Sequence, residues 1–277
     1  MPDLLSVAAS IVGITVPALH GTRLLLDDLN KIVDAPNVVQ TLREDIASVG
    51  MALQSLQTIK DPEWENLGET IANQSKATIR NCERLCSMFR GNLQRWTKHS
   101  EGRLSWHDRA KVGFFKERQI KAMSEQLQSC KIAFNSAVGT ATLYSSIRHT
   151  HITEEIRKTI STNEAEISKA ITLTASQLAD VEAALREARL TVPTHDQGQN
   201  NEDIISSVKQ VEEEQAALSC SRKLLEELLS KAREDVIAKA ASESQERLTR
   251  VTFGNNNSGF QVGIINGPIS GISFGGK

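Results

Sequence analysis

Apolar residues recur at the spacing of a helix along most of this chain. Between positions 38 and 59 they fall four, three, four and three residues apart, at Leu42, Ile46, Val49, Leu53 and Leu56. That spacing places them on one face of a helix. The same pattern predicts a helix over about 24–33 and longer helices over about 61–96 and 105–147. We expect these helices to pack as a bundle around one core.

A second pattern begins at Ile152. Apolar residues then follow heptad-like steps of three or four residues through residue 188, and after a polar break steps of four and three alternate over 204–236. Such spacing requires a partner helix, and the break lets the two segments fold back as an antiparallel pair. Asn163 and Thr174 place polar groups at two seam positions. The pattern fits an extension of the bundle core and an independent coiled coil equally well.

The first apolar segment carries no formal charge from Leu4 to Thr22. As a helix rising ~1.5 Å per residue, it would span close to the ~30 Å hydrocarbon core of a bilayer. A buried helix of a bundle has the same composition, and we expect that state in the resting protein. On release, the residues expected to enter a membrane are Leu4, Leu5, Val7, Ile11, Val12, Ile14, Val16 and Leu19.

The C-terminal segment, residues 252–277, has glycine at every fourth position from Gly259 to Gly275. It reads almost the same in both directions about Gly267, and Lys277 has its only charged side chain. Uncharged β-branched segments with Asn and Gln stack as cross-β fibrils, whereas glycine-rich composition alone is typical of a disordered tail. The residues expected in a fibril core are Asn257, Gly259, Phe260, Gln261, Val262, Gly263, Ile264, Ile265, Gly267, Ile269, Gly271, Ile272 and Phe274.

Phe260-Gln261-Val262-Gly263 resembles the (Ile/Val)-Gln-(Ile/Val)-Gly core of the RHIM amyloid motif of RIP kinases. The wider Asn-x-Gly-x-Gln-x-Gly pattern from Asn257 to Gly263 is similar to the pseudo-palindromic motif of fungal HELLP-type proteins. The uncharged N-terminal segment also resembles the start of HeLo-like domains. The resemblance implies a HeLo-like helical domain followed by a prion-forming amyloid motif.

The same resemblance implies a function. HELLP-type proteins suggest a pore-forming or membrane-disrupting role in programmed cell death of filamentous fungi, of the kind seen in heterokaryon incompatibility and comparable to necroptosis. They also imply an upstream NLR-like receptor that carries a matching amyloid motif.

Charge is concentrated in one stretch, although the formal net charge of the chain is only −2. Residues 90–121 hold nine Lys or Arg against three Asp or Glu, interleaved with Trp and Phe. A solvated face is the commonest source of such a run, and anionic lipid headgroups are the second candidate. No nucleic-acid-binding signature accompanies the charge. The candidate lipid contacts are Arg95, Lys98, Arg103, Arg109, Lys111, Lys116 and Arg118.

The remaining chemistry of the sequence is sparse. Cys82, Cys86, Cys130 and Cys220 lack the paired ligands of a zinc site, so buried, reduced thiols are expected. No catalytic motif appears in a suitable context, and we expect neither enzymatic activity nor a cofactor.

The expected fold is all-α, with a helical bundle followed by long antiparallel helices and a disordered tail able to form amyloid. The expected segments are a HeLo-like bundle over 1–150, a helix pair over 151–240, a hinge over 241–251 and the amyloid motif over 252–277. We expect a cytoplasmic resting protein that assembles into fibrils with itself and moves to the plasma membrane after activation. The alternative is a helical scaffold whose tail drives homotypic assembly without membrane attack.

Overall fold

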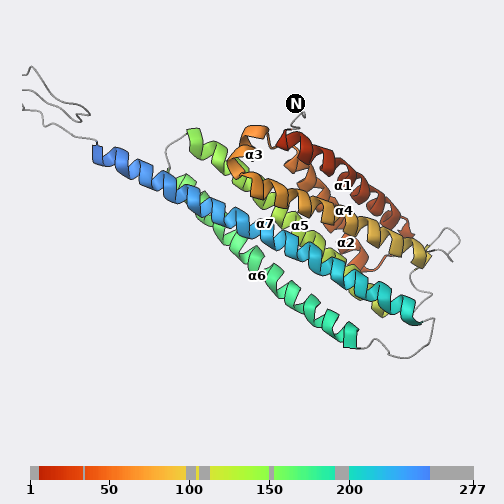
Figure 1. Cartoon of the computed structure of the whole chain (residues 1–277). Coiled ribbons are helices and arrows are strands. Elements are labelled where there is room, and N and C mark those ends of the chain that lie inside the picture. The colour runs from red at the N-terminus through yellow and green to blue at the C-terminus, as the bar shows by residue number, and fades with distance from the viewer. Residues whose placement is uncertain are drawn as a thin grey trace, which may run out of the picture. The chain divides into compact units, whose positions relative to one another are not determined.

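The computed structural model describes residues 6–33, 35–97, 104–105, 113–149, 153–190 and 200–249, and these residues form an all-α fold (Figure 1). The all-α prediction is therefore confirmed. The chain divides into two compact units, Met1–Ser230 and Lys231–Lys277, and the packing described below is that of the first unit. The described elements are α1 (Val7–Asn30), β1 (Ile32–Val33), α2 (Asn37–Leu56), α3 (Asp61–Leu67), α4 (Glu69–Thr97), β2 (Leu104–Ser105), α5 (Gly113–His149), α6 (Glu154–Leu190) and α7 (Asn200–Thr249).

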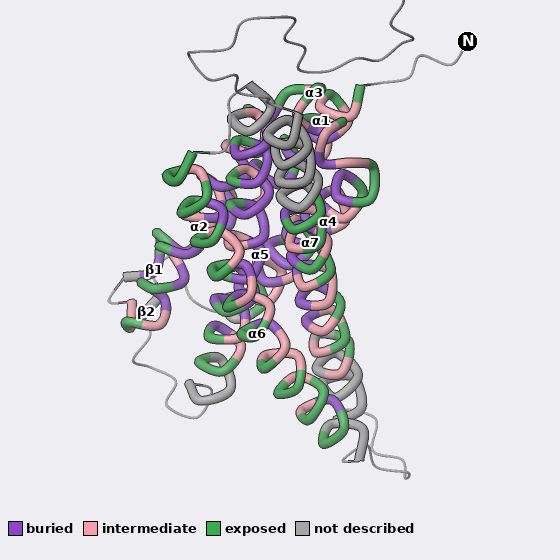
Figure 2. The backbone as a smooth tube through the Cα atoms, turned by 90° about the vertical axis from the view of Figure 1, so that its left-hand side faces the viewer, coloured by how far each residue is buried: buried purple, intermediate pink, exposed green. Residues whose placement is uncertain are grey.

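Helix α5 lies at the centre of this core. Helices α2, α3, α4 and α6 pack against it, and its residues are buried along most of its length (Figure 2). Phe134 is one of the largest fully buried side chains. Polar contacts also join α5 to α2, because the buried carboxylate of Asp45 accepts hydrogen bonds from Ser124 Oγ and from Gln128 Nε2 (3.2 Å). A helix enclosed in this way does not show the single apolar stripe of a surface helix.

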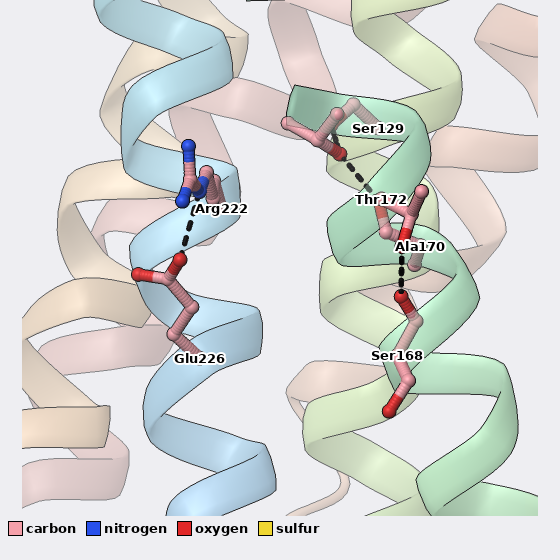
Figure 3. A network of polar contacts seen from close by, with 7 residues as sticks. Ser129, Ser168, Ala170, Thr172, Arg222 and Glu226 are labelled. Carbon is pink, nitrogen blue, oxygen red and sulfur yellow. Dashed lines mark hydrogen bonds and ion pairs between the residues drawn. The ribbon is translucent and has the colours of Figure 1, made fainter. Parts of the chain in front are cut away.

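The predicted faces of α2 and α6 are confirmed. All five apolar positions predicted over 38–59 are buried in α2. The two polar seam positions of α6 face polar groups of α5: the Thr174 hydroxyl lies 3.2 Å from Ser129 Oγ, and Asn163 Nδ2 donates to Thr140 Oγ1 at 3.4 Å. Figure 3 shows the Ser129 hydroxyl directed toward α6. The helix pair therefore extends the bundle core through α5.

Helix α7 runs antiparallel to α6 (Figure 1), and its buried stripe is wider than the predicted seam. Leu218 and Leu225 are buried as expected, but Ser221, Leu224 and Leu228, which lie off the seam, are buried too. The reason is that α7 meets three helices rather than one. Its polar contacts are Glu213 with Arg84 Nη1 of α4 (3.0 Å), Ser221 Oγ with Cys130 Sγ of α5 (3.7 Å), and Gln215 Nε2 with Glu182 Oε1 of α6 (3.4 Å).

One helix boundary near the N-terminus differs from the prediction. Helix α1 runs unbroken through Pro17 to Asn30, so the uncharged segment to Thr22 and the helical pattern that continues over 24–33 belong to one helix. The helix predicted over 61–96, by contrast, is split at Gly68, which adopts φ +92°. A positive φ suits glycine and ends a helix, since other residues are strained there.

Two further differences lie at the predicted ends of helices. Ile32 and Val33, at the end of the helix predicted over about 24–33, pair in parallel with Leu104 and Ser105, and no strand was predicted at either place. Helix α7 continues to Thr249, so residues 241–249 of the predicted hinge are helical in this structure. Their Ser, Glu, Gln and Arg side chains are polar but compatible with a helix.

Candidate membrane-targeting helix

Helix α1 has one face built into the bundle. It packs against α2, α3 and α4, and its buried residues are Ile11, Thr15, Ala18, Leu19, Thr22, Leu25 and Leu29. Burial of a Leu or Ile side chain contributes about 1.5–3 kcal/mol. Four such side chains therefore oppose removal of the helix by roughly 6–12 kcal/mol, so α1 is an integral part of the resting core.

The two buried hydroxyls of α1 are satisfied within the helix itself. Thr15 Oγ1 donates to the Ile11 carbonyl at 2.7 Å, and Thr22 Oγ1 donates to the Leu19 carbonyl at 2.9 Å. Hydrogen bonds of this kind need no partner from outside the helix. The buried face of α1 would consequently carry no unsatisfied hydroxyl into another apolar environment.

The opposite face of α1 is apolar where it meets solvent. Val12 is 36% exposed and Val16 is 55% exposed, and Ala9, Gly13 and Pro17 beside them are exposed as well. Large apolar side chains on a surface often mark an interaction site. Within the described residues, α1 is the one helix that is long and apolar enough to cross a membrane, although core helices of soluble proteins share these properties.

The structure divides the predicted membrane residues between the two faces. Ile11 and Leu19 are buried, Val7 and Ile14 are half-buried, and Val12 and Val16 are exposed. Leu4 and Leu5 lie outside the described residues. Some apolar residues of this segment thus pack in the protein core, while others face solvent.

The amino end of α1 is capped from two places. Ser6 Oγ accepts a hydrogen bond from the backbone N–H of Ala9 at 3.1 Å. Asp61, at the start of α3, accepts one from the backbone N–H of Ala8 at 2.9 Å. A carboxylate suits the positive end of the helix dipole, so Asp61 both caps α1 and ties it to α3.

The carboxyl end of α1 is held by two arginines from other helices. Arg43 Nη2 of α2 donates to the carbonyl of Leu29 at 2.6 Å and to that of Ile32 at 3.0 Å. Arg90 Nε of α4 lies 2.7 Å from Asp28 Oδ2. These contacts bind the last turn of α1 and β1 to two neighbouring helices.

Asp28 lies beyond the uncharged segment and titrates abnormally. Burial would raise the pKa of its carboxyl group, but hydrogen bonds from Arg90 and Lys31 outweigh that effect and lower the pKa below its ordinary value. The carboxylate is therefore ionised and paired throughout the neutral range.

Sequence reasoning missed all of these contacts at the ends of α1. Asp61 was only the first residue of the helix predicted over 61–96, and Arg90 was counted in the basic stretch. The one available signal was the pair of acidic residues, Asp27 and Asp28, at the carboxyl end of an apolar helix, where cations are preferred.

The other predicted residues are only partly described. Arg95 and Arg118 are exposed, which fits either a solvated face or a lipid contact. The side chains of Lys98, Arg103, Arg109, Lys111 and Lys116 and the whole predicted amyloid core from Asn257 to Phe274 lie outside the described residues.

The cysteine prediction is confirmed for three of the four thiols. Cys82, Cys86 and Cys130 are buried, whereas Cys220 is partly exposed, and all four are reduced. A hydrogen bond with Cys82, together with burial, holds the pKa of the Cys130 thiol well above its ordinary value. Among the described side chains, no cluster of three or more His, Cys, Asp or Glu residues is placed to hold a metal ion.

Comparison with known protein families matches residues 2–226 to the family described as "Pigment biosynthesis cluster protein PigL N-terminal". No curated protein and no solved structure matches the chain. The matched range nearly coincides with the compact unit Met1–Ser230 and ends before the C-terminal glycine-rich segment. It is consistent with a fungal helical domain. Because the match covers most of the sequence, the chain belongs to the PigL N-terminal family.

Proposed function

We propose that this protein is a membrane-disrupting cell-death executioner whose C-terminal motif assembles as amyloid on a matching motif of an NLR-like receptor. The observation that carries the proposal is helix α1, which has the length and composition of a membrane-spanning segment and exposes Val12 and Val16 to solvent. Its buried hydroxyls are bonded within the helix. Assembly of the tails would concentrate the helical domains, and the released α1 would then enter the bilayer.

Deleting the first 22 residues is a poor test of this proposal. The deletion would remove Ile11, Ala18 and Leu19 from the core and unfold part of the bundle, so that any loss of activity would have two explanations. Substitutions on the exposed face of α1 avoid the problem, because surface changes usually alter stability by less than about 0.5 kcal/mol.

The double variant Val12→Asp/Val16→Asp is the test we favour. An Asp near the centre of a membrane-spanning helix costs roughly 2.5–3.5 kcal/mol, while the exposed positions tolerate it in the bundle. The matched control is Met51→Asp on α2, where the native side chain is 62% exposed. Full-length proteins would be seeded with fibrils of a peptide of residues 251–277 and mixed with dye-loaded vesicles containing phosphatidylserine.

We expect the parent and Met51→Asp to release the dye, and the double variant to release little. Equal release by all three proteins would show that α1 is not the membrane-active element. If the parent forms fibrils on seeding but releases no dye, the scaffold alternative is favoured. In a companion variant, Gln261→Asp, stacked like charges should prevent fibril formation altogether.

A further inference from the structure

The carboxyl end of α1 has the wrong charge for a free helix. Asp27 and Asp28 lie in its last turn, and no basic residue does. The end of the helix dipole there is negative, so both carboxylates are unfavourable. Lys31 follows the helix and pairs locally with Asp28 at 2.9 Å, but the other cations come from elsewhere in the bundle.

The bundle supplies the missing positive charge through Arg43 and Arg90. Arg43 donates to the carbonyl of Leu29, which lies in the last turn of α1 where carbonyls lack an intrahelical partner, and to the carbonyl of Ile32 in β1. Arg90 pairs with Asp28, whose side chain is only 18% exposed. The last turn of α1 is therefore stabilised by contacts that exist only while the helix is docked.

We propose that Asp28, Arg43 and Arg90 form a latch at the carboxyl end of α1, so that breaking this cluster weakens the docking of the helix in the bundle. The latch would control when α1 leaves the bundle. Its effect at a membrane rests on the proposed function. Undocking itself is measured separately, in the absence of lipid.

The latch is not fully satisfied. Arg43 Nε is buried and has no hydrogen-bond partner among the described residues. A partly satisfied polar network is weaker than a complete one. The cluster is thus suited to hold α1 at rest and to give way when neighbouring domains are forced together.

The contacts of the latch differ from an ion pair between neighbouring residues of one exposed helix. Asp28 and Arg90 are 62 residues apart in the sequence, and they join α1 to α4 at a point where Arg43 also joins α2 and β1. By contrast, the Arg84–Glu213 pair joins the same helix α4 to α7 rather than to α1. Arg84 therefore provides a matched control with similar chemistry.

The experiment is a charge-swap cycle on the full-length chain: Asp28→Arg, Arg90→Asp, and the double variant Asp28→Arg/Arg90→Asp, with Arg84→Asp as control. Hydrogen exchange followed by mass spectrometry would report on the amides of α1 and α5 without lipid. We expect each single variant to speed exchange in α1 by about tenfold or more, the scale of a lost charge-assisted hydrogen bond. Exchange in α5 should not change, and the double variant should regain most of the protection.

Several outcomes would overturn the latch. One is that both single variants leave the exchange rate of the α1 amides unchanged. Another is that the α1 amides of the double variant exchange as fast as those of the single variants. Equal acceleration in α1 and α5, or acceleration of α1 in Arg84→Asp, would indicate general destabilisation. Should the swaps themselves fold poorly, Asp28→Asn and Arg43→Met are milder variants, and we expect both to speed exchange in α1 selectively.

A vesicle assay then separates the latch from the proposed function. We expect the single variants to release dye from phosphatidylserine vesicles at a lower concentration of fibril seeds than the parent requires. If α1 opens in these variants but no dye is released, the latch stands and the membrane function fails. If the seeded parent releases dye but the swaps leave α1 closed, the membrane function stands and the latch fails.

Discussion

Replacing Leu25 by Ala is the sharpest test of whether α1 belongs to the cooperative core. Leu25 is fully buried in the middle of the carboxyl half of α1. Its truncation removes three carbon atoms, worth about 2.4 kcal/mol in transfer free energy. The cavity left between packed helices adds to that loss, so we expect the free energy of unfolding to fall by roughly 3–5 kcal/mol.

Urea unfolding of the purified chain, followed by circular dichroism, would measure the change. We expect the midpoint to fall with little change in slope, because the surface exposed on unfolding stays almost the same. Met51→Ala is the control: this side chain is 62% exposed, so its truncation should change the unfolding free energy by less than about 0.5 kcal/mol. A loss below about 1 kcal/mol for Leu25→Ala would refute our view of α1, since it would mean that the helix lies loosely on the bundle.

Three further predictions follow from single groups. A thiol reagent at neutral pH should modify Cys220 quickly and the three buried cysteines only on unfolding. Burial and the raised pKa of Cys82 and Cys130 disfavour the reactive thiolate. Rapid reaction of all four cysteines would contradict this packing. Gly68→Ala should destabilise the fold by roughly 1–2 kcal/mol in the same urea assay, since φ is +92° although a Cβ would have free space; an unchanged midpoint would mean that the backbone adapts. The pKa of the Asp28 carboxyl group is lower in the folded protein than its ordinary value of about 4. The ionised carboxylate therefore contributes its full stabilisation above pH ~4, and this contribution is lost as the pH falls through the lowered pKa. Asp28→Asn should therefore be less stable than the parent at pH 7, and this difference should shrink in acid; a difference that is constant with pH would show that the carboxylate is not the stabilising group.

Periodicity predicted α2 and α6 well because each of these two helices has a clear apolar face. The positions expected in α2 are buried without exception, and no described seam position of α6 is exposed. Such patterns depend on local spacing alone, which a sequence contains in full.

Backbone details and contacts between distant segments were not predictable from local spacing. Gly68 is a single residue within a long helical pattern, and its positive φ is visible only in the backbone. Pro17 lies at an exposed position where α1 continues. The pairing of Arg90 with Asp28 depends on how α4 crosses α1, which no local pattern contains.

The candidate site was predicted in part. Sequence composition identified the apolar helix and its length, while its division into a buried face and an exposed face required the neighbours to be known. Val12 and Val16 are equivalent to Ile11 and Leu19 by hydropathy alone, and only the packing of α2 and α4 distinguishes them.

The polar pairs between α5 and α6 have a consequence for comparing family members. Ser129 lies opposite Thr174 and Thr140 lies near Asn163, so the two contacts are 11 positions apart on both helices. Eleven residues correspond to about three helical turns, which keeps both contacts on one face. An insertion or deletion between Ser129 and Thr140 must therefore be matched by an equal one between Asn163 and Thr174. Relatives that conserve this fold should change length in the two helices together, and an alignment that shifts only one of them is misplaced.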